Sequence, residues 1–188
     1  MKIVSAKEMR RIEASVFIEK GEHLENEFMK KAGSGIAKIM ERHIRREKGF
    51  RNIVQRKRSI LLICGKGNNA GDAFVVARRL LCLDRKVRVF LLVDPKQYKG
   101  STKKNYEILT HMKAKMLQLE AVSDLNAFFE SSQGPFVAID GILGTGLKGN
   151  LEGIGTGDLS KLIKLRHMFS WNIFYNIFLL NYFEKKYR

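Results

Sequence analysis

The 188-residue chain carries 35 lysine and arginine residues against 19 aspartate and glutamate residues, for a formal net charge of +16. With 45% hydrophobic and 29% charged residues it has the composition of a folded globular protein, which excludes a disordered or a collagen-like chain. Its length suits one domain over residues 1–188. Two cysteines, Cys64 and Cys82, are too few for a disulfide framework or a structural zinc site, so we expect two small buried side chains in a reducing compartment.

Neither end of the chain predicts export or a membrane span. Residues 1–8 contain no long apolar stretch of the kind found in a secretory leader. The apolar run 168–183 is interrupted by asparagines and falls short of the roughly 20 apolar residues of a spanning helix. We therefore expect a cytoplasmic protein without a membrane partner. Attachment of the run 168–183 to a membrane surface is kept as a weaker alternative.

Two amphipathic helices are predicted ahead of the first strand. Ser5 and Glu8 have the spacing of a capping box and open a helix that extends to about residue 20. A second helix is predicted over residues 24–48, because apolar residues recur along one face. These residues are Phe28, Met29, Ala32, Ile36, Ala37, Met40 and Ile44. Gly33 and Gly35 in this helix would let another backbone approach closely.

Strands and helices alternate from residue 59 onward. Strands are predicted at 59–64, 86–93, 116–119 and 135–140, and helices at 72–83, 101–113 and 123–131. The first strand is a continuous apolar run, as in strands that are buried on both faces. Alternation of this kind implies parallel pairing, so the sequence predicts an α/β fold with a doubly wound parallel sheet covered by helices on both faces.

Basic residues concentrate between Arg42 and Arg58, where only Glu47 opposes them. Such a cluster attracts the phosphates of RNA or of a small nucleotide. The other interpretation, a solvated helix end and linker, is favoured because Phe50 is the only aromatic residue among these charges.

A glycine-rich loop, Gly65 to Asp72, follows the first predicted strand. Ligands of doubly wound sheets bind beyond the carboxyl ends of the strands, so this loop is a candidate site. Its spacing matches neither a Walker loop nor the dinucleotide fingerprint. Asn68, Asn69 and Asp72 add amide and carboxylate oxygens, which suit hydroxyl groups or a hard cation. The structural alternative is a plain strand-to-helix turn in which Asp72 caps the helix.

A second glycine-rich loop, residues 140–149, follows the last predicted strand. Asp140 lies at the end of that buried strand, where a carboxylate is costly unless a cation, a ligand or hydrogen bonds meet it. The segment Gly144-Thr145-Gly146 offers backbone amides as a phosphate-binding turn does. A capping aspartate before a glycine turn is the structural alternative. The four histidines lie outside both loops and no serine stands in a nucleophile elbow, so no hydrolase triad is predicted.

Taken together, the loops resemble those of the YjeF N-terminal domain family, which contains the NAD(P)H-hydrate epimerases. The matching segments are Gly67-Asn68-Asn69-Ala70-Gly71-Asp72, Ala77-Arg78-Arg79-Leu80 and Asp140-Gly141-Ile142-Leu143-Gly144-Thr145-Gly146-Leu147. Residues 5–9 and 28–33 also look like the family's first two helices, so the resemblance spans about residues 1–165. It implies a Rossmann-like three-layer α/β/α sandwich, a homodimer, and metabolite repair by interconversion of the R and S hydrates of NADH and NADPH. A companion NAD(P)HX dehydratase would then restore the cofactor.

The resemblance also implies roles for individual residues. Binding of the hydrated cofactor would fall to Asn68, Asn69, Ala70, Gly71, Asp72, Gly144, Thr145, Gly146, Leu147, Lys148, Gly149 and Asn150. Asn69 and Asp140 would be ligands of a potassium ion, and Asp140 would also be catalytic as an acid–base group. The residue chemistry agrees, because a weakly charged cation prefers amide and carboxylate oxygens and backbone amides suit a pyrophosphate.

Two departures from the family pattern bear on activity. Ala70 stands where the family usually has glycine. The family's later Asp-x-Pro-Ser-Gly motif, which supplies a ligand contact and a potassium ligand, has no counterpart, because the two prolines are Pro95 and Pro135. We expect residues 166–188 to be a divergent tail without a glycine-punctuated strand, from a truncated or frameshifted product, or else a divergent helix. The alternative function is an inactive binding module for nucleotide or RNA, like the related domains of mRNA-decapping scaffold proteins.

Overall fold

The computed structural model describes residues 8, 11–12, 14–16, 18, 21–46, 60–120, 124, 128, 137–142 and 173–176. Its helices are α2 (Glu22–Arg46), α4 (Asn68–Cys82), the 3-10 helix η1 (Pro95–Gln97) and α5 (Gly100–His111). Its strands are β1 (Ile60–Cys64), β2 (Val87–Leu91), β3 (Lys115–Gln118), β4 (Val137–Gly141) and β5 (Ile173–Asn176). These elements confirm the four predicted strands and the predicted helix 24–48. The predicted helices 5–20 and 123–131 and most of the basic cluster lie outside the described residues.

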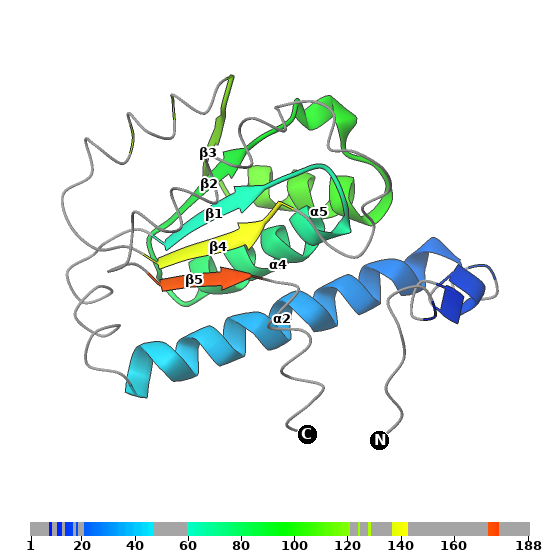
Figure 1. Cartoon of the computed structure of the whole chain (residues 1–188), viewed down its shortest axis with the longest axis horizontal. Coiled ribbons are helices and arrows are strands. Elements are labelled where there is room, and N and C mark those ends of the chain that lie inside the picture. Colours follow the sequence, from blue (N-terminus) through cyan, green and yellow to red (C-terminus); the bar gives the residue numbers. More distant parts are fainter. Residues whose placement is uncertain are drawn as a thin grey trace.

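The five strands form one parallel sheet in the order β3-β2-β1-β4-β5 (Figure 1). In the register of the sheet, Ile63 of β1 lies between Phe90 of β2 and Asp140 of β4. This is the strand order of a Rossmann-like fold, in which the chain leaves β1 on one side and returns to it on the other. The topological switch point therefore lies between β1 and β4, and the two glycine-rich loops leave the sheet at these two strands.

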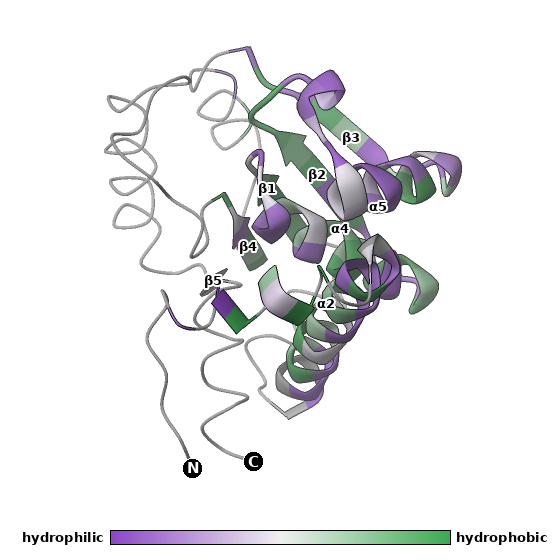
Figure 2. Cartoon of the chain, turned by 90° about the vertical axis from the view of Figure 1, so that its right-hand side faces the viewer, coloured by the Kyte–Doolittle hydropathy of each residue, from purple (hydrophilic) through white to green (hydrophobic). Residues whose placement is uncertain are grey.

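The strands β1, β2 and β4 are buried on both faces of the sheet, as in a three-layer α/β/α sandwich, whereas the edge strand β3 is largely exposed. The helices α2, α4 and α5 lie on one face (Figure 2), where Leu62 packs in a core with Phe74 of α4. On the opposite face Ile63 and Phe90 form a second buried cluster. Phe128 packs against that cluster, with its ring centroid 4.9 Å from that of Phe90. The apolar sequence of β1 follows from this arrangement, because every second residue points to each of the two cores.

Helix α2 crosses α4 closely at Gly33. A Cβ atom added there would lie 2.6 Å from the Cβ of Val75 and 2.8 Å from the carbonyl oxygen of Asp72, so the predicted close approach is confirmed at this position. The predicted apolar face is wrong at Phe28, which is 49% exposed because it lies off the buried stripe that begins at Met29. None of the helices in the described ranges is long and apolar enough to cross a membrane.

The tail contains a strand that the sequence analysis did not predict: β5 pairs in parallel with β4 from Ile173 to Asn176, so the alternative of a divergent helix is wrong for these four residues. The segment begins with a β-branched residue and two aromatic residues, which favour extended backbone. Its pairing covers the edge of β4 with backbone hydrogen-bonding groups. The rest of the tail lies outside the described residues.

The two cysteines differ in exposure, which corrects the expectation that both are buried. Cys64 ends β1 in the core, whereas Cys82 is exposed in the last turn of α4. Burial, and then the nearby charge of Asp140, raise the pKa of the Cys64 thiol far above its usual value. We therefore predict that iodoacetamide modifies Cys82 in the folded protein and Cys64 only after unfolding, as peptide mapping by mass spectrometry would report. Equal labelling of both thiols without denaturant would contradict this assignment.

Candidate functional site

The first glycine-rich segment is mostly helix, not loop. Helix α4 begins at Asn68, four residues earlier than predicted, with Gly67 as its N-cap in an extended conformation. The Gly67 carbonyl accepts hydrogen bonds from the backbone N–H groups of Ala70 at 3.0 Å and Gly71 at 3.4 Å. Asp72 lies inside the helix, so the alternative that it caps the helix is wrong. The first turn of α4 has no acidic residue and no side-chain cap, so no side chain within that turn compensates the positive end of the helix dipole.

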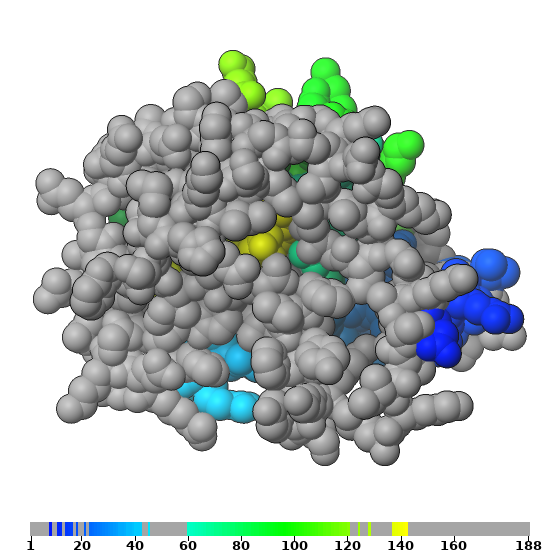
Figure 3. Space-filling view, in the orientation of Figure 1, coloured from blue at the N-terminus to red at the C-terminus, as the bar shows by residue number. Residues whose placement is uncertain are grey.

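This first turn packs directly on the end of β4. The N–H of Gly65 donates to the carbonyl of Gly141 at 3.1 Å. A Cβ atom added to Gly141 would lie 2.8 Å from the Cβ of Ala73 and 3.3 Å from the carbonyl oxygen of Asn69. Because Gly141 follows Asp140 directly, the structure brings Asn69 and Asp140 to the same edge of the sheet, as predicted. Atoms of 137–142 (yellow) reach the surface beside the β1–α4 segment (blue-green) in Figure 3.

Asp140 is held in place by the turn that it starts. Its Oδ1 accepts the backbone N–H of Ile142 at 2.9 Å, the two-residue spacing of an Asx turn. The residue is partly buried at the end of β4 beside Cys64, so its carboxylate has a fixed direction and limited access to water. A carboxylate oriented in this way can accept and return a proton.

Several oxygen atoms lie around Gly141, the residue that follows Asp140. Asn69 is only 8% exposed, and the carbonyl oxygens of Ile63 and Asn69 both lie within 3.3 Å of the position that a Gly141 Cβ would occupy. Carbonyl and carboxylate oxygens are the donors preferred by hard cations. Within the part of the chain that the structure describes, no three His, Cys, Asp or Glu side chains gather as a metal cluster.

The other predicted site residues have different outcomes. Ala70 is fully buried in the core, so the methyl group that replaces the family's usual glycine is accommodated. A Cβ atom at Gly71 would collide with the Met29 side chain and lie 2.9 Å from Thr102 Oγ1, so this glycine serves helix packing. The whole set from Gly144 to Asn150 lies outside the described residues, and its role as a phosphate-binding turn stays a prediction.

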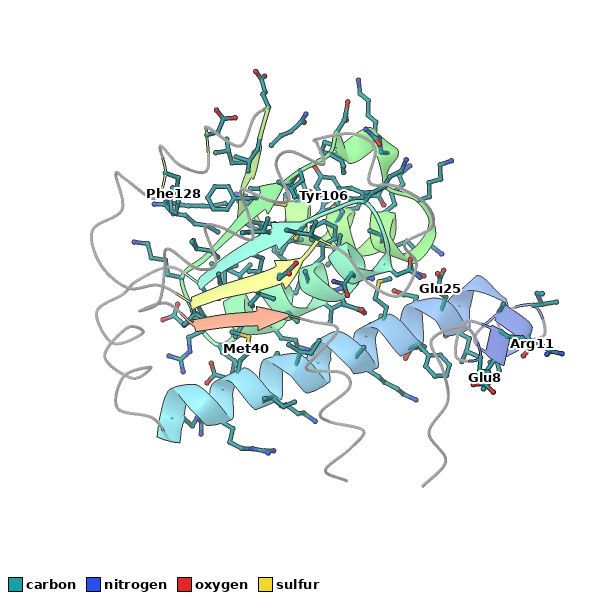
Figure 4. All side chains as sticks on the ribbon, in the orientation of Figure 1. Glu8, Arg11, Glu25, Met40, Tyr106 and Phe128 are labelled. Carbon is teal, nitrogen blue, oxygen red and sulfur yellow. The ribbon has the colours of Figure 1, made fainter. Side chains whose placement is uncertain are left out.

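Sequence reasoning missed a residue on α2 that touches this site. Glu25 accepts a hydrogen bond from Asn68 Nδ2 at 3.2 Å, across 43 positions of the sequence. Figure 4 shows Glu25 on the part of α2 that lies nearest to the start of α4 and α5. No local pattern marks it, because a charged residue in an amphipathic helix is ordinarily solvated.

The strand order defines a Rossmann-like α/β protein with its topological switch point between β1 and β4, the place where ligands bind in folds of this class. A family model described as "YjeF-related protein N-terminus" matches residues 25–168. The chain belongs to this family.

Relatives agree with that membership, and a solved structure shares the fold. Over 136 residues, or 72% of this chain, it is 37% identical to a bifunctional NAD(P)H-hydrate repair enzyme Nnr of Moorella thermoacetica. Over 96 residues, or 51% of this chain, it is 32% identical to an NAD(P)H-hydrate epimerase of Pirellula staleyi. The matched parts cover 24% of the Moorella protein and 42% of the Pirellula protein. The crystal structure of yeast ynu0 superposes with a TM-score of 0.72 and 20% identity over 94% of this chain and 70% of that one, which supports the shared fold.

Proposed function

We propose that this protein interconverts the R and S hydrates of NADH or NADPH. The observation that carries the proposal is the contact between the first turn of α4, which contains Asn69, and Gly141 at the end of β4, which follows Asp140. Relatives that share this domain are named NAD(P)H-hydrate epimerase or repair enzyme, at 32% and 37% identity, and the family model matches residues 25–168, which contain both loops. The alternative of an inactive RNA-binding module has no comparable support.

The chemistry needs one group that takes and returns a proton. Hydration of the reduced ring puts a hydroxyl group on the carbon next to the ring nitrogen. When the bond between these two atoms opens, the hydroxyl proton moves to a base, the carbon becomes an aldehyde, and the electron pair stays on the nitrogen, where the conjugated carboxamide delocalises it. Closure on the other face of the ring takes the proton back. Asp140, oriented by its bond to Ile142, is the group that we assign to this transfer.

Potassium is proposed as the cofactor, with Asn69 and Asp140 as ligands. Its chemistry would be to supply positive charge that balances the carboxylate and helps to hold oxygen atoms of the ligand. Asn69 suits this role because it is only 8% exposed and carries an amide oxygen, a type of donor that hard cations accept.

Asn69→Ala is predicted to raise the potassium concentration needed for half-maximal activity by about tenfold, the effect of losing one ligand of roughly 1.4 kcal/mol. The measurement is a potassium titration of the epimerase rate, with choline chloride added to keep the ionic strength constant. An unchanged midpoint would remove Asn69 from the cation site.

The function itself is tested with a mixture of the two hydrate epimers and a dehydratase that consumes one of them. In the presence of potassium, added protein should convert the slow second phase of consumption into a fast one. If the second phase keeps its uncatalysed rate at micromolar protein, the chain is not an epimerase. Salt-sensitive binding of RNA by the same preparation would then favour the alternative.

A further inference from the structure

We propose that Glu25 is a positioning residue that fixes the side-chain amide of Asn68, so that Asn68 presents its carbonyl oxygen to a donor group of the ligand. The identity of that ligand rests on the proposed function, whereas the contact between Glu25 and Asn68 does not.

One carboxylate joins three helices at this point. Glu25 of α2 accepts from Asn68 Nδ2 of α4 through Oε1 at 3.2 Å, and from Ser101 Oγ of α5 through Oε2 at 3.1 Å. Its two oxygens therefore face two different helices, and a rotation that breaks one hydrogen bond disturbs the other. This two-sided attachment limits the directions that the Asn68 side chain can take while bonded.

The α5 side of this arrangement is rigid. Ser101 is 1% exposed and Asn105 is fully buried. Asn105 Nδ2 donates to the Ser101 carbonyl at 2.9 Å and to Asn26 Oδ1 of α2 at 3.0 Å, while its Oδ1 accepts from Arg78 of α4 at 2.6 Å. A buried network whose members are bonded on several sides holds its shape. Asn26 belongs to this network, so the backbone of α2 is held in place next to Glu25.

The start of α5 lies beside the Glu25 carboxylate. The N-cap of α5, Lys99, makes no side-chain capping bond, and the first turn contains no acidic residue. Gly100 has a φ of +50°, and a Cβ atom there would lie 3.5 Å from Glu25 Oε2. A carboxylate beside free backbone amides at a helix start is stabilised by the helix dipole. Glu25 is therefore held at this place independently of Asn68.

This geometry decides which end of the Asn68 amide meets a ligand. An ionised carboxylate only accepts hydrogen bonds, so the NH₂ group of Asn68 faces Glu25. The carbonyl oxygen is the other end of the same planar group, and Asn68 is exposed at the first position of α4. The matching ligand group is a donor, either a hydroxyl or a carboxamide N–H. A hydrated nicotinamide ring carries both.

The first test distinguishes a positioning role of Glu25 from a role in stabilising the fold. It uses steady-state kinetics of the whole chain, and the substrate is the epimer that the dehydratase does not consume. Glu25→Ala should raise KM about tenfold and leave kcat within about twofold, the effect of one misplaced hydrogen bond. Glu25→Gln should restore KM to within about threefold of the parent, because the glutamine carbonyl still accepts from Asn68 and its amide can donate to Ser101. The matched control is Glu27→Ala, two positions along α2, where the carboxylate pairs with Lys30 at 2.8 Å and should leave KM unchanged.

The second test asks whether Glu25 acts through Asn68. In the Asn68→Ala background, Glu25→Ala should produce no further rise in KM. If the two residues acted independently, the fold-changes in KM of the two single variants would multiply in the double variant. The proposal is overturned by any of three results. These are a double variant in which the two rises in KM multiply, a Glu25→Ala variant with the KM of the parent, and a Glu25→Gln variant with a KM as high as that of Glu25→Ala.

A measurement without substrate distinguishes failure of this inference from failure of the proposed function. In ¹⁵N-labelled protein, the side-chain NH₂ signals of Asn68, assigned by their loss in Asn68→Ala, should shift in Glu25→Ala and stay in place in Glu27→Ala. If the Asn68 NH₂ signals keep their chemical shifts in Glu25→Ala, the contact between Glu25 and Asn68 does not exist in solution, even if the enzyme is active. A parent protein without epimerase activity but with the expected shift would reject the function and keep the contact.

Discussion

Asp140→Asn is expected to lower the epimerase rate by about 10²–10⁴-fold, the range in which a positioned acid–base group contributes. The substitution keeps the shape of the side chain and an oxygen that can accept the N–H of Ile142, so the turn at the end of β4 should remain. It removes the negative charge and the capacity to take up a proton. The rate is measured by coupling to the dehydratase, and the fold by circular dichroism and thermal unfolding.

Asp94→Asn is the matched control for this prediction. Asp94 also follows a strand of the sheet, and it also accepts a backbone N–H two residues ahead, from Lys96 at 2.8 Å. It lies after β2, away from the switch point between β1 and β4. Asp94→Asn should therefore change the rate by less than about threefold. A similar rate for the two variants, with Asp140→Asn folded, would show that Asp140 takes no part in the chemistry.

The sheet and its switch point were predictable because buried parallel strands have a simple sequence pattern. The run from Ile60 to Cys64 is apolar throughout, and both of its faces are buried. Asp140 could be recognised as a candidate site residue because it is a charged residue at the end of another apolar run, where burial of a carboxylate is costly. The order of strands then follows from the handedness of parallel crossovers, which brings the ends of β1 and β4 together.

The start of α4 was not predictable from local propensity. Asparagine and glycine favour turns, so the segment from Asn68 to Gly71 suggested a loop. Packing decides otherwise, because Ala70 and Ala73 are buried in the core and Gly71 lies against Met29 of α2. The small side chains that weaken helix propensity are the ones that allow this turn to approach β4 and α2. Strand β5 was missed for a related reason, since its pairing with β4 is a long-range contact.

The residue types of the candidate site were predictable from the sequence, but the helix residues that contact them were not. Asn69 and Asp140 could be expected at the same edge of the sheet, because each lies close to the carboxyl end of a buried strand. Glu25 and Ser101 could not, since they contact the site from helices that are distant in the sequence. Residues of this kind are found only when the packing angles of the helices are known.

Gly65→Ala is the substitution with the second large expected effect. A Cβ atom at Gly65 would overlap the carbonyl oxygen of Ile142 and lie 3.1 Å from its carbonyl carbon and Cα. Since these are backbone atoms, relief requires the β4 turn to move away from β1. Overpacking of this kind lowers the free energy of unfolding by about 1–3 kcal/mol. The same movement displaces Asp140, and a misplacement of about 1 Å costs on the order of 100-fold in rate.

Gly67→Ala provides a control two residues further along the same segment. An added Cβ atom at Gly67 would meet no heavy atom within 4 Å, and the backbone there has a φ of −90°, which alanine adopts readily. Alanine is a weaker N-cap than glycine, so the free energy of unfolding should fall by less than about 1 kcal/mol. Urea unfolding and the coupled rate assay compare the two variants. If Gly65→Ala and Gly67→Ala lose equal stability and activity, the loss of glycine flexibility explains the effect. The close contact between Gly65 and Ile142 would then not be the cause.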